Sequence, residues 1–192
     1  MTEFQIIMAA VTLFFIYKIY DYIQNTDHDA KQEEGQNSAV NRGPSAEELV
    51  KKADIAYEYG DTQKAQSLLE AADAIRMDDP EITGKLAFMR AKNGHTDQAI
   101  ESYLHAITLD RDNDQYHAAL ASLYREKGMV QEAKNHYEKA LTIDPEYEIT
   151  YYNYGNLLQD MGETEKAKTM YEKAVGLNAD FTEAKEELEK LS

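Results

Sequence analysis

The chain has 192 residues with three prolines, which leaves room for one folded domain and short appendages. Its formal net charge of −16 argues against nucleic acid as a ligand, because a phosphate backbone attracts basic surfaces. The absence of cysteine excludes disulfides, thiolate metal sites and a cysteine nucleophile.

The first element along the chain is an apolar segment at residues 4–23. No charge interrupts Phe4–Tyr17, and apolar side chains continue beyond it with Lys18 and Asp21 between them. A helix over the whole segment would be about 30 Å long, close to the hydrocarbon thickness of a bilayer. No basic residue precedes the run and no small-residue cleavage site follows it, which disfavours a cleaved signal peptide. We expect a single-pass transmembrane helix; the alternative is an amphipathic helix that docks on the rest of the chain or on a partner.

The few charges beside this segment predict its orientation. Glu3 precedes it without any lysine or arginine, whereas Lys18 and Lys31 follow. The bias of basic residues toward the cytoplasm therefore places the rest of the chain on the cytoplasmic side of the membrane. The alternative is that the rest of the chain faces the periplasm.

Residues 24–44 form a polar linker in which almost no side chain is suited to burial, so we expect this stretch to be disordered. A flexible chain of this length has a root-mean-square reach of roughly 25 Å. Ser45 follows, with Glu48 three positions later, and this spacing predicts a capping box at the start of a helix.

From residue 46 onward the chain repeats itself at a constant interval. The period is marked by four glycines, each 34 positions after the one before: Gly60, Gly94, Gly128 and Gly162. The units are 46–79, 80–113, 114–147 and 148–181. A fixed period of this length predicts an array of helical hairpins.

Each unit carries a small, a bulky and again a small residue at spacings of four and three, which places all three on one helical face. The first small residues are Ala65, Ala99, Ala133 and Ala167; the bulky ones are Leu69, Tyr103, Tyr137 and Tyr171; the second small ones are Ala72, Ala106, Ala140 and Ala174. Such a face lets two helices approach closely while one large side chain fills the gap. We expect these tyrosines, with Tyr124 and Tyr154, to lie in the core.

The last stretch, 182–191, is rich in glutamate and lysine and is typical of a polar helix that covers the end of a repeat array. Asp180 and Glu183 have the spacing of a second capping box before it.

The period and its small and aromatic positions resemble the tetratricopeptide repeat family. The two best copies read Tyr151, Tyr154, Gly155, Leu158, Ala167, Tyr171, Ala174 and His117, Leu120, Ala121, Tyr124, Ala133, Tyr137, Ala140, Pro145. The first unit departs from the family with Lys52 in place of a leucine, and the second with Arg90 in place of an aromatic residue. The resemblance implies an all-α protein: a right-handed superhelical solenoid of four helix-turn-helix repeats with a C-terminal capping helix. The predicted organisation is an anchor at 1–23, a linker at 24–44 and a repeat domain at 45–192.

In this family the first helix of each unit lines a concave groove that binds peptides or proteins. The resemblance places these residues in that groove and we single them out as the candidate site: Lys85, Phe88, Lys92, Ser122, Arg125, Tyr152, Asn153 and Asn156. The two asparagines can donate to and accept from the main chain of an extended peptide. Tyr152 offers a flat surface beside them, and the three cations are suited to an acidic segment. The alternative is that the asparagines are solvated or cap neighbouring turns.

Related repeats that bind the C-termini of chaperones hold the terminal carboxylate with lysine, arginine and asparagine. The positions of that clamp carry Val50, Asp54, Lys85, Gln115 and Ala119 here, so this type of ligand is excluded. The five histidines form no i, i+4 pair, and no metalloprotease, phosphate-loop or nucleophile-elbow motif is present. We therefore expect no catalytic site, no metal and no cofactor.

Two functions remain. The first is a membrane-tethered interaction module that binds a peptide or partner protein and recruits it to a membrane complex. The second is a scaffold that self-associates as a homo-oligomer, with the N-terminal segment or an exposed repeat edge of one molecule docking into the next.

Overall fold

The computed structural model describes residues 43–191, and within this range it contains nine helices and no strand. The predicted anchor at 4–23 and nearly all of the predicted linker lie outside the described residues. None of the helices between residues 43 and 191 combines the length and the apolar character needed to cross a membrane.

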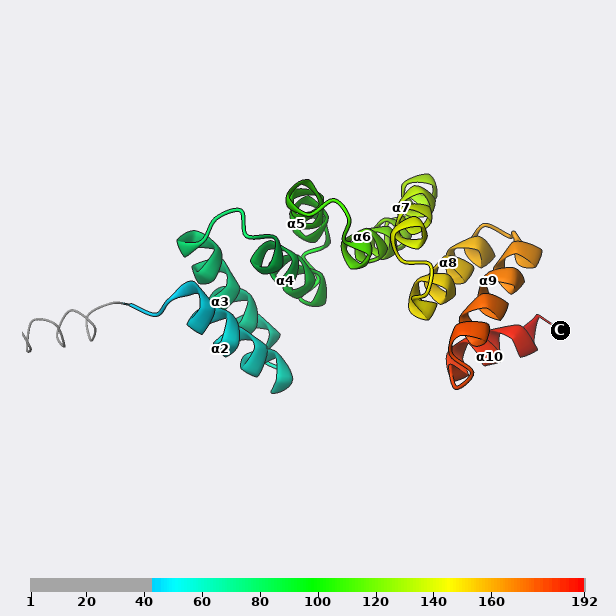
Figure 1. The fold of residues 1–192 in the computed structure, drawn as a ribbon, viewed down its shortest axis with the longest axis horizontal. Coiled ribbons are helices and arrows are strands. Elements are labelled where there is room, and N and C mark those ends of the chain that lie inside the picture. Colours follow the sequence, from blue (N-terminus) through cyan, green and yellow to red (C-terminus); the bar gives the residue numbers. More distant parts are fainter. Residues whose placement is uncertain (1–42, 192) are drawn as a thin grey trace, which may run out of the picture. The chain divides into compact units, whose positions relative to one another are not determined.

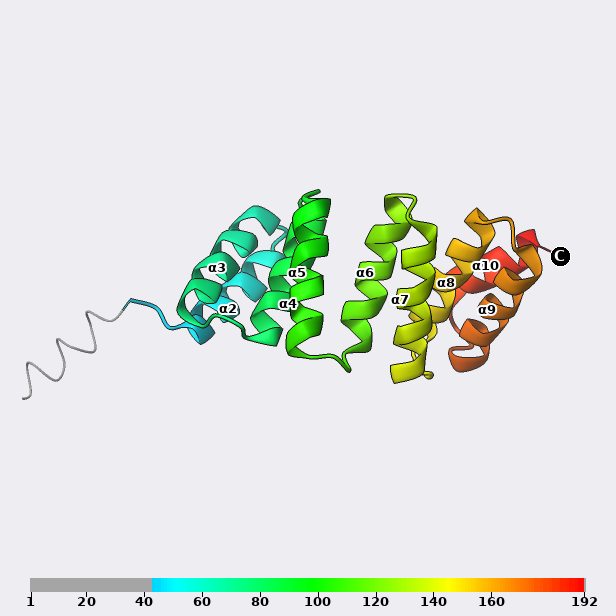
Figure 2. The ribbon, with the colours of Figure 1, turned by 90° about the horizontal axis from the view of Figure 1, so that it is seen from above.

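The helices form four pairs followed by one single helix. In chain order they are α2 (Ala46–Glu58), α3 (Thr62–Ile75), α4 (Pro80–Lys92), α5 (Thr96–Leu109), α6 (Asp114–Glu126), α7 (Val130–Ile143), α8 (Glu148–Asp160), α9 (Thr164–Leu177) and α10 (Thr182–Lys190). The two helices of a pair pack against each other, and the second helix of each pair also packs against the first helix of the next pair (Figures 1 and 2). The prediction of an all-helical solenoid is confirmed for this part of the chain.

The four periodic glycines close the turns inside the pairs. Gly60, Gly94, Gly128 and Gly162 have φ angles of 79°, 78°, 72° and 76°, in the left-handed region that side chains with a Cβ rarely adopt. In the first turn the Gly60 amide donates to the Tyr57 carbonyl at 2.9 Å, and the Asp61 amide donates to the Ala56 carbonyl at 2.9 Å. These bonds satisfy carbonyls that the end of α2 leaves without helical partners. The constant spacing of the glycines therefore reflects the left-handed backbone conformation that each of these turns requires.

The small-bulky-small face is the contact between the two helices of each pair. Ala65, Ala99, Ala133 and Ala167 are all fully buried, and so are the rings of Tyr137 and Tyr171. Tyr137 also stacks on Tyr154 of α8 with ring centroids 5.7 Å apart, which joins the third pair to the fourth. The prediction that these tyrosines belong to the core is confirmed for Tyr103, Tyr137, Tyr154 and Tyr171, whereas Tyr124 is only partly buried and packs against the core from outside.

The C-terminal helix begins where it was predicted, but its cap differs from the prediction. The helix begins at Thr182 with Phe181 in the capping position, and no side chain caps it. The Asp180 amide instead donates to Asn178 Oδ1 at 3.0 Å. Asp180 therefore belongs to the turn that follows α9 and does not form a capping box with Glu183. The physical reason is that Phe181 occupies the capping position with its side chain packed against the core, so no polar side chain is available there.

Gly155 is small because a buried ring lies against it. A Cβ at this position of α8 would lie 2.5 Å from Cε1 and 2.8 Å from Cδ1 of Tyr171. That ring is fully buried, and its hydroxyl lies 2.8 Å from Asn156 Oδ1, so it has little freedom to move away. Gly176 of α9, by contrast, has open space where its Cβ would be.

We predict opposite effects of alanine at these two glycines. Gly176→Ala should raise the free energy of unfolding by about 0.5–1 kcal/mol, because alanine is the better helix former. Gly155→Ala gains the same helix propensity but should lower the free energy of unfolding by about 1–2 kcal/mol net, since overpacking displaces the ring of Tyr171. Urea denaturation of both variants measures the difference. Equal stabilisation by the two substitutions would mean that Tyr171 is not held where the structure places it.

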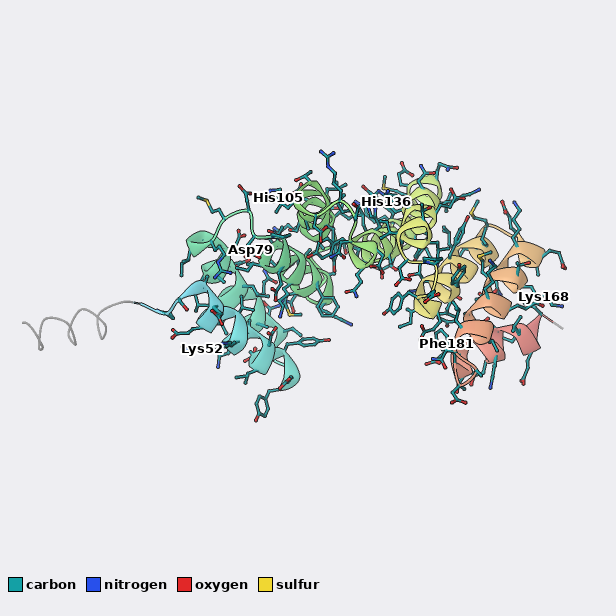
Figure 3. All side chains as sticks on the ribbon, in the orientation of Figure 1. Lys52, Asp79, His105, His136, Lys168 and Phe181 are labelled. Carbon is teal, nitrogen blue, oxygen red and sulfur yellow. The ribbon has the colours of Figure 1, made fainter. Side chains whose placement is uncertain are left out.

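Two histidines face each other inside the third pair. Nδ1 of His117 on α6 lies 2.9 Å from Nδ1 of His136 on α7, and the rings stack with centroids 5.2 Å apart. Figure 3 shows His136 where α7 lies beside α6. Burial lowers the pKa of both imidazoles below the usual value for histidine, and a short contact between two ring nitrogens requires that only one of them carries a proton.

We predict that this pair makes the protein less stable in acid. Because the unfolded chain takes up protons at a higher pH than the folded pair, the free energy of unfolding falls as the pH drops below about 6.5 and continues to fall until the lowered pKa values are passed. Replacing both residues by glutamine should flatten this dependence between pH 7 and pH 5 in chemical denaturation. The exposed His95, replaced in the same way, is the control that should leave the dependence unchanged. An unaltered slope in the double variant would contradict the assignment.

Candidate peptide-binding groove

The predicted site residues lie on three first helices. Lys85, Phe88 and Lys92 are on α4, Ser122 and Arg125 on α6, and Tyr152, Asn153 and Asn156 on α8. Four of the eight line two separate hollows, whereas Lys92, Ser122, Tyr152 and Asn153 line neither. One includes Lys85 and Phe88, and the other includes Arg125 and Asn156.

The first hollow is apolar and lies between α4 and α6. It has a volume of about 380 Å³ and is lined by Glu81, Gly84, Lys85, Phe88, Tyr103, Asn113, Gln115, Tyr116 and Ala119; we call it the Phe88 hollow. A neighbouring hollow of about 220 Å³ shares Lys85 and Phe88 and continues to Tyr57 on α2. The rings of Tyr57 and Phe88 meet edge to face, with centroids 5.5 Å apart.

A glycine allows this hollow to form. A Cβ on Gly84 would collide with the ring of Tyr116, so the tyrosine of α6 can lie across α4 only because residue 84 has no side chain. The Tyr116 hydroxyl then donates to the Pro80 carbonyl at 2.7 Å. Burial raises the pKa of Tyr116, so it stays neutral and keeps this donor. Tyr116 was missed as a site residue, although a glycine inside a predicted helix is a known signal of close approach.

Two of the three predicted cations already have carboxylate partners in a neighbouring repeat. Lys85 Nζ lies 2.7 and 2.8 Å from the two carboxylate oxygens of Asp54, and Arg125 Nε donates to Asp160 at 2.5 Å. The bond to Asp160 raises the pKa of Arg125. Lys92 Nζ lies 5.3 Å from the ring centroid of Phe88. An acidic ligand would therefore compete with Asp54 and Asp160 for the first two cations, and exposed pairs of this kind are worth roughly 0.2–1 kcal/mol each.

The polar residues of the groove also hold core tyrosines. Asn156 Oδ1 and Gln159 Oε1 lie 2.8 and 2.9 Å from the Tyr171 hydroxyl. One repeat earlier, the hydroxyls of Ser122 and Tyr137 share a bond of 2.9 Å. Ser122 and Asn156 thus satisfy the polar end of a buried ring. Sequence reasoning missed this role, because each of the two lies 15 positions before its tyrosine and on a different helix.

The C-terminal half of the groove is narrowed by the chain itself. Tyr152 packs between Tyr171 and Phe181, with ring centroids 5.9 and 5.1 Å away, and Figure 3 shows Phe181 at the start of α10. Glu187 of α10 reaches the second hollow, of about 210 Å³, which Arg125, Asn156, Gln159 and Asp160 also line. Tyr152 is therefore part of the packing of α10, and its flat surface is not available as expected. The open, apolar half of the groove lies on α2, α4 and α6.

Within residues 43–191 no three histidine, aspartate or glutamate side chains converge in a way that could hold a metal ion. The carboxylates near the groove are engaged in ion pairs with lysine or arginine, such as Asp54 and Asp160.

Three models of the tetratricopeptide repeat match this chain, at residues 56–123, 121–162 and 149–181. No curated protein sequence matches it. Among solved structures, a fragment of MamA from Desulfovibrio magneticus RS-1 is 17% identical with a TM-score of 0.70, over 78% of this chain and 84% of the other. PilF of Pseudomonas aeruginosa is 22% identical with a TM-score of 0.70, over 76% and 67% of the two chains. YrrB, described as having an unusual peptide-binding site, is 19% identical with a TM-score of 0.66, over 73% of each chain.

At these identities the solved structures show a shared fold, whereas the family models match the sequence itself. The matched stretches together cover the four periodic glycines and the alanine and tyrosine faces described above. Residues 56–181 of this chain belong to the tetratricopeptide repeat family.

Proposed function

We propose that this protein is a non-enzymatic interaction module that binds an extended peptide or a segment of a partner protein in its groove. Proteins of the tetratricopeptide repeat family generally mediate protein–protein interactions. The main support for the proposal is the Phe88 hollow, an open apolar pocket between α4 and α6. A peptide side chain that fills such a pocket contributes about 1.5–3 kcal/mol of burial, which is enough to anchor an otherwise polar contact.

The polar groups around the hollow suit the main chain of the ligand. Gln115 lies at its edge, and Asn153 lies half-buried on α8. Side-chain amides both donate and accept, so they can pair with a peptide backbone of any sequence. We therefore propose an apolar residue of the ligand in the Phe88 hollow, followed by main-chain contacts along α6 and α8. Asn153 and Lys92 keep the roles predicted from the sequence. Asn156 already uses Oδ1 toward Tyr171 and Arg125 already uses Nε toward Asp160, so each would bind the ligand through its remaining N–H donors.

Blocking the hollow should abolish peptide binding without unfolding the protein. Ala119 lines the hollow and Ala118 does not, and both alanines are half-buried on α6. Peptides selected on the wild type from a random display library should carry an apolar anchor residue. Ala119→Arg should weaken their binding by about tenfold or more, equivalent to about 1.4 kcal/mol, while Ala118→Arg has a smaller effect. Fluorescence polarisation gives the affinities, and circular dichroism shows that both variants stay folded. If the peptides bind Ala119→Arg as tightly as the wild type, the Phe88 hollow is not part of the binding site.

We further propose that residues 4–23 anchor the module in a membrane, with the repeats on the cytoplasmic side. The support is the sequence: an uncharged run followed by tyrosines, and lysines only after it. An anchor would hold the groove at high local concentration beside a membrane complex and so recruit the bound partner.

Membrane extraction tests the anchor independently of the groove. The full chain should stay in the membrane fraction after a carbonate wash. Leu13→Arg should release much of it, because a central arginine costs about 2.5–3.5 kcal/mol on insertion. Val40→Arg, in the polar linker, is the matched control and should not release it. If the wild type is washed into the soluble fraction, the anchor is wrong and the groove proposal is unaffected.

A further inference from the structure

The first repeat has an open face on the side of α2 and α3 that points away from α4. Figure 3 shows Lys52 on this side of α2. The face contains a hollow of about 420 Å³ lined by Lys52, Ile55, Ala56, Tyr59, Asp61, Lys64 and Leu68; we call it the N-terminal face. Ile55 is 52% exposed and Tyr59 is 85% exposed, so large apolar side chains meet solvent there.

The position of Ile55 is buried in every later repeat. The residues 34, 68 and 102 positions after Ile55 are Met89, Leu123 and Leu157, which are only 4%, 6% and 0% exposed. Each packs against the second helix of the preceding pair: Met89 with Leu69 of α3, Leu123 with Tyr103 of α5, and Leu157 with Tyr137 of α7. The N-terminal face is thus a copy of a surface that receives an apolar helix three times within this chain.

The chain directly before the first repeat cannot supply that helix in register. One period before Ala65, Leu69 and Ala72 stand Lys31, Gly35 and Ser38. A charged residue, a glycine and a hydroxyl replace the small-bulky-small face, so this stretch has no apolar side chain to bury there. The occupant must come from elsewhere.

We propose that residues 4–23 of the same chain pack as a helix on the N-terminal face when no membrane is present. This segment is the one long apolar stretch outside the repeats. The linker at 24–44 has a reach of roughly 25 Å, and α2, which begins at Ala46, extends about 20 Å along the face. The segment can therefore reach the face, and a linker of this length gives an effective concentration in the millimolar range.

Charge favours the same occupant. Lys52 and Lys64 line the hollow together with one carboxylate, Asp61, which accepts a hydrogen bond from the Lys64 backbone amide. No ion pair within residues 43–191 involves either lysine side chain. The segment carries Lys18 and Asp21 near its end, and the linker continues with Asp27 and Asp29. A docked segment would bring three carboxylates toward the two lysines.

Docking and anchoring compete for one segment. The docked form shields the apolar side chains of residues 4–23 from water, and a bilayer that takes up the segment exposes the N-terminal face again. Only the release of the segment from the N-terminal face rests on the proposed membrane anchor. The docking of the segment depends on the face and on the length of the linker.

Disulfide formation in the full chain tests the docking. The chain has no cysteine, so every disulfide comes from introduced residues. Phe14→Cys, Phe15→Cys and Ile16→Cys are each combined with Ile55→Cys; successive residues of a helix point about 100° apart, so at least one of the three faces the repeat. The control partner is Tyr57→Cys, because Tyr57 is 40% exposed and lies on the same helix as Ile55 but faces Phe88 of α4, so the tether brings the segment equally close to both positions. The protein is made by cell-free synthesis without membrane or detergent and oxidised at low concentration.

We expect at least one pair with position 55 to form an intramolecular disulfide about tenfold faster than the pair with position 57, because only a docked segment distinguishes two sides of the same helix. Charge reversal by Lys52→Glu with Lys64→Glu should slow this reaction, and vesicles of phosphatidylcholine and phosphatidylglycerol should abolish the preference. Equal rates at the two positions would overturn the docking. Disulfide-linked dimers in place of the intramolecular product would also overturn it, because they would show that the segment of a second molecule binds the N-terminal face.

Flotation with the same vesicles separates this inference from the anchor. If the protein floats with the vesicles but its disulfides show no preference for position 55, the anchor is supported and the docking is wrong. If the disulfides prefer position 55 but the protein does not float, the docking is supported and the anchor is wrong.

Discussion

The structure depends on the close approach of the two helices in each pair. At one position of every second helix a fully buried alanine removes the bulk that would hold the helices apart, and a leucine or tyrosine four positions later fills the remaining space. This contact fixes the pair as a unit, and the left-handed glycine in the turn fixes its connection. The groove inherits its shape from this packing, because the first helices can line a surface only when the second helices lie behind them.

Much of the fold could be predicted from the sequence because the constraints recur in phase. One buried alanine is common, but four that recur in step with four left-handed glycines leave few alternatives. The cap of α10 was not predictable in the same way. Asp180 and Glu183 have the spacing of a capping box, but Phe181 occupies the capping position and packs against the core with part of its side chain. The helix therefore begins at the predicted residue without the predicted hydrogen bonds.

The candidate site was less accessible to sequence reasoning, since its properties come from pairs of residues in different helices. Of the predicted residues, Phe88 and Lys85 line a hollow between α4 and α6. The salt bridge between Asp54 and Lys85 joins residues 31 positions apart, and the contact of His117 with His136 joins two helices. A one-dimensional period reports which face a residue occupies, but not which side chain of the adjacent helix meets it. For that reason Lys85 and Arg125 looked free in the sequence and are paired in the structure.

The two ends of the repeat array are built differently, and this asymmetry explains Lys52. At the C-terminal end α10 covers the last pair, burying Ala184 and turning a row of glutamates outward. At the other end the repeat surface is left open, and the position that carries Leu86, Leu120 and Tyr154 in later repeats carries a lysine. The long stem of a lysine can lie on apolar neighbours while its charge stays in water, which suits a surface that is exposed for part of the time. A permanently solvated end would be expected to replace Ile55 as well, and a permanently buried one would be expected to keep the leucine. The combination of Lys52 with the retained Ile55 is what the proposed reversible docking of residues 4–23 requires of this face.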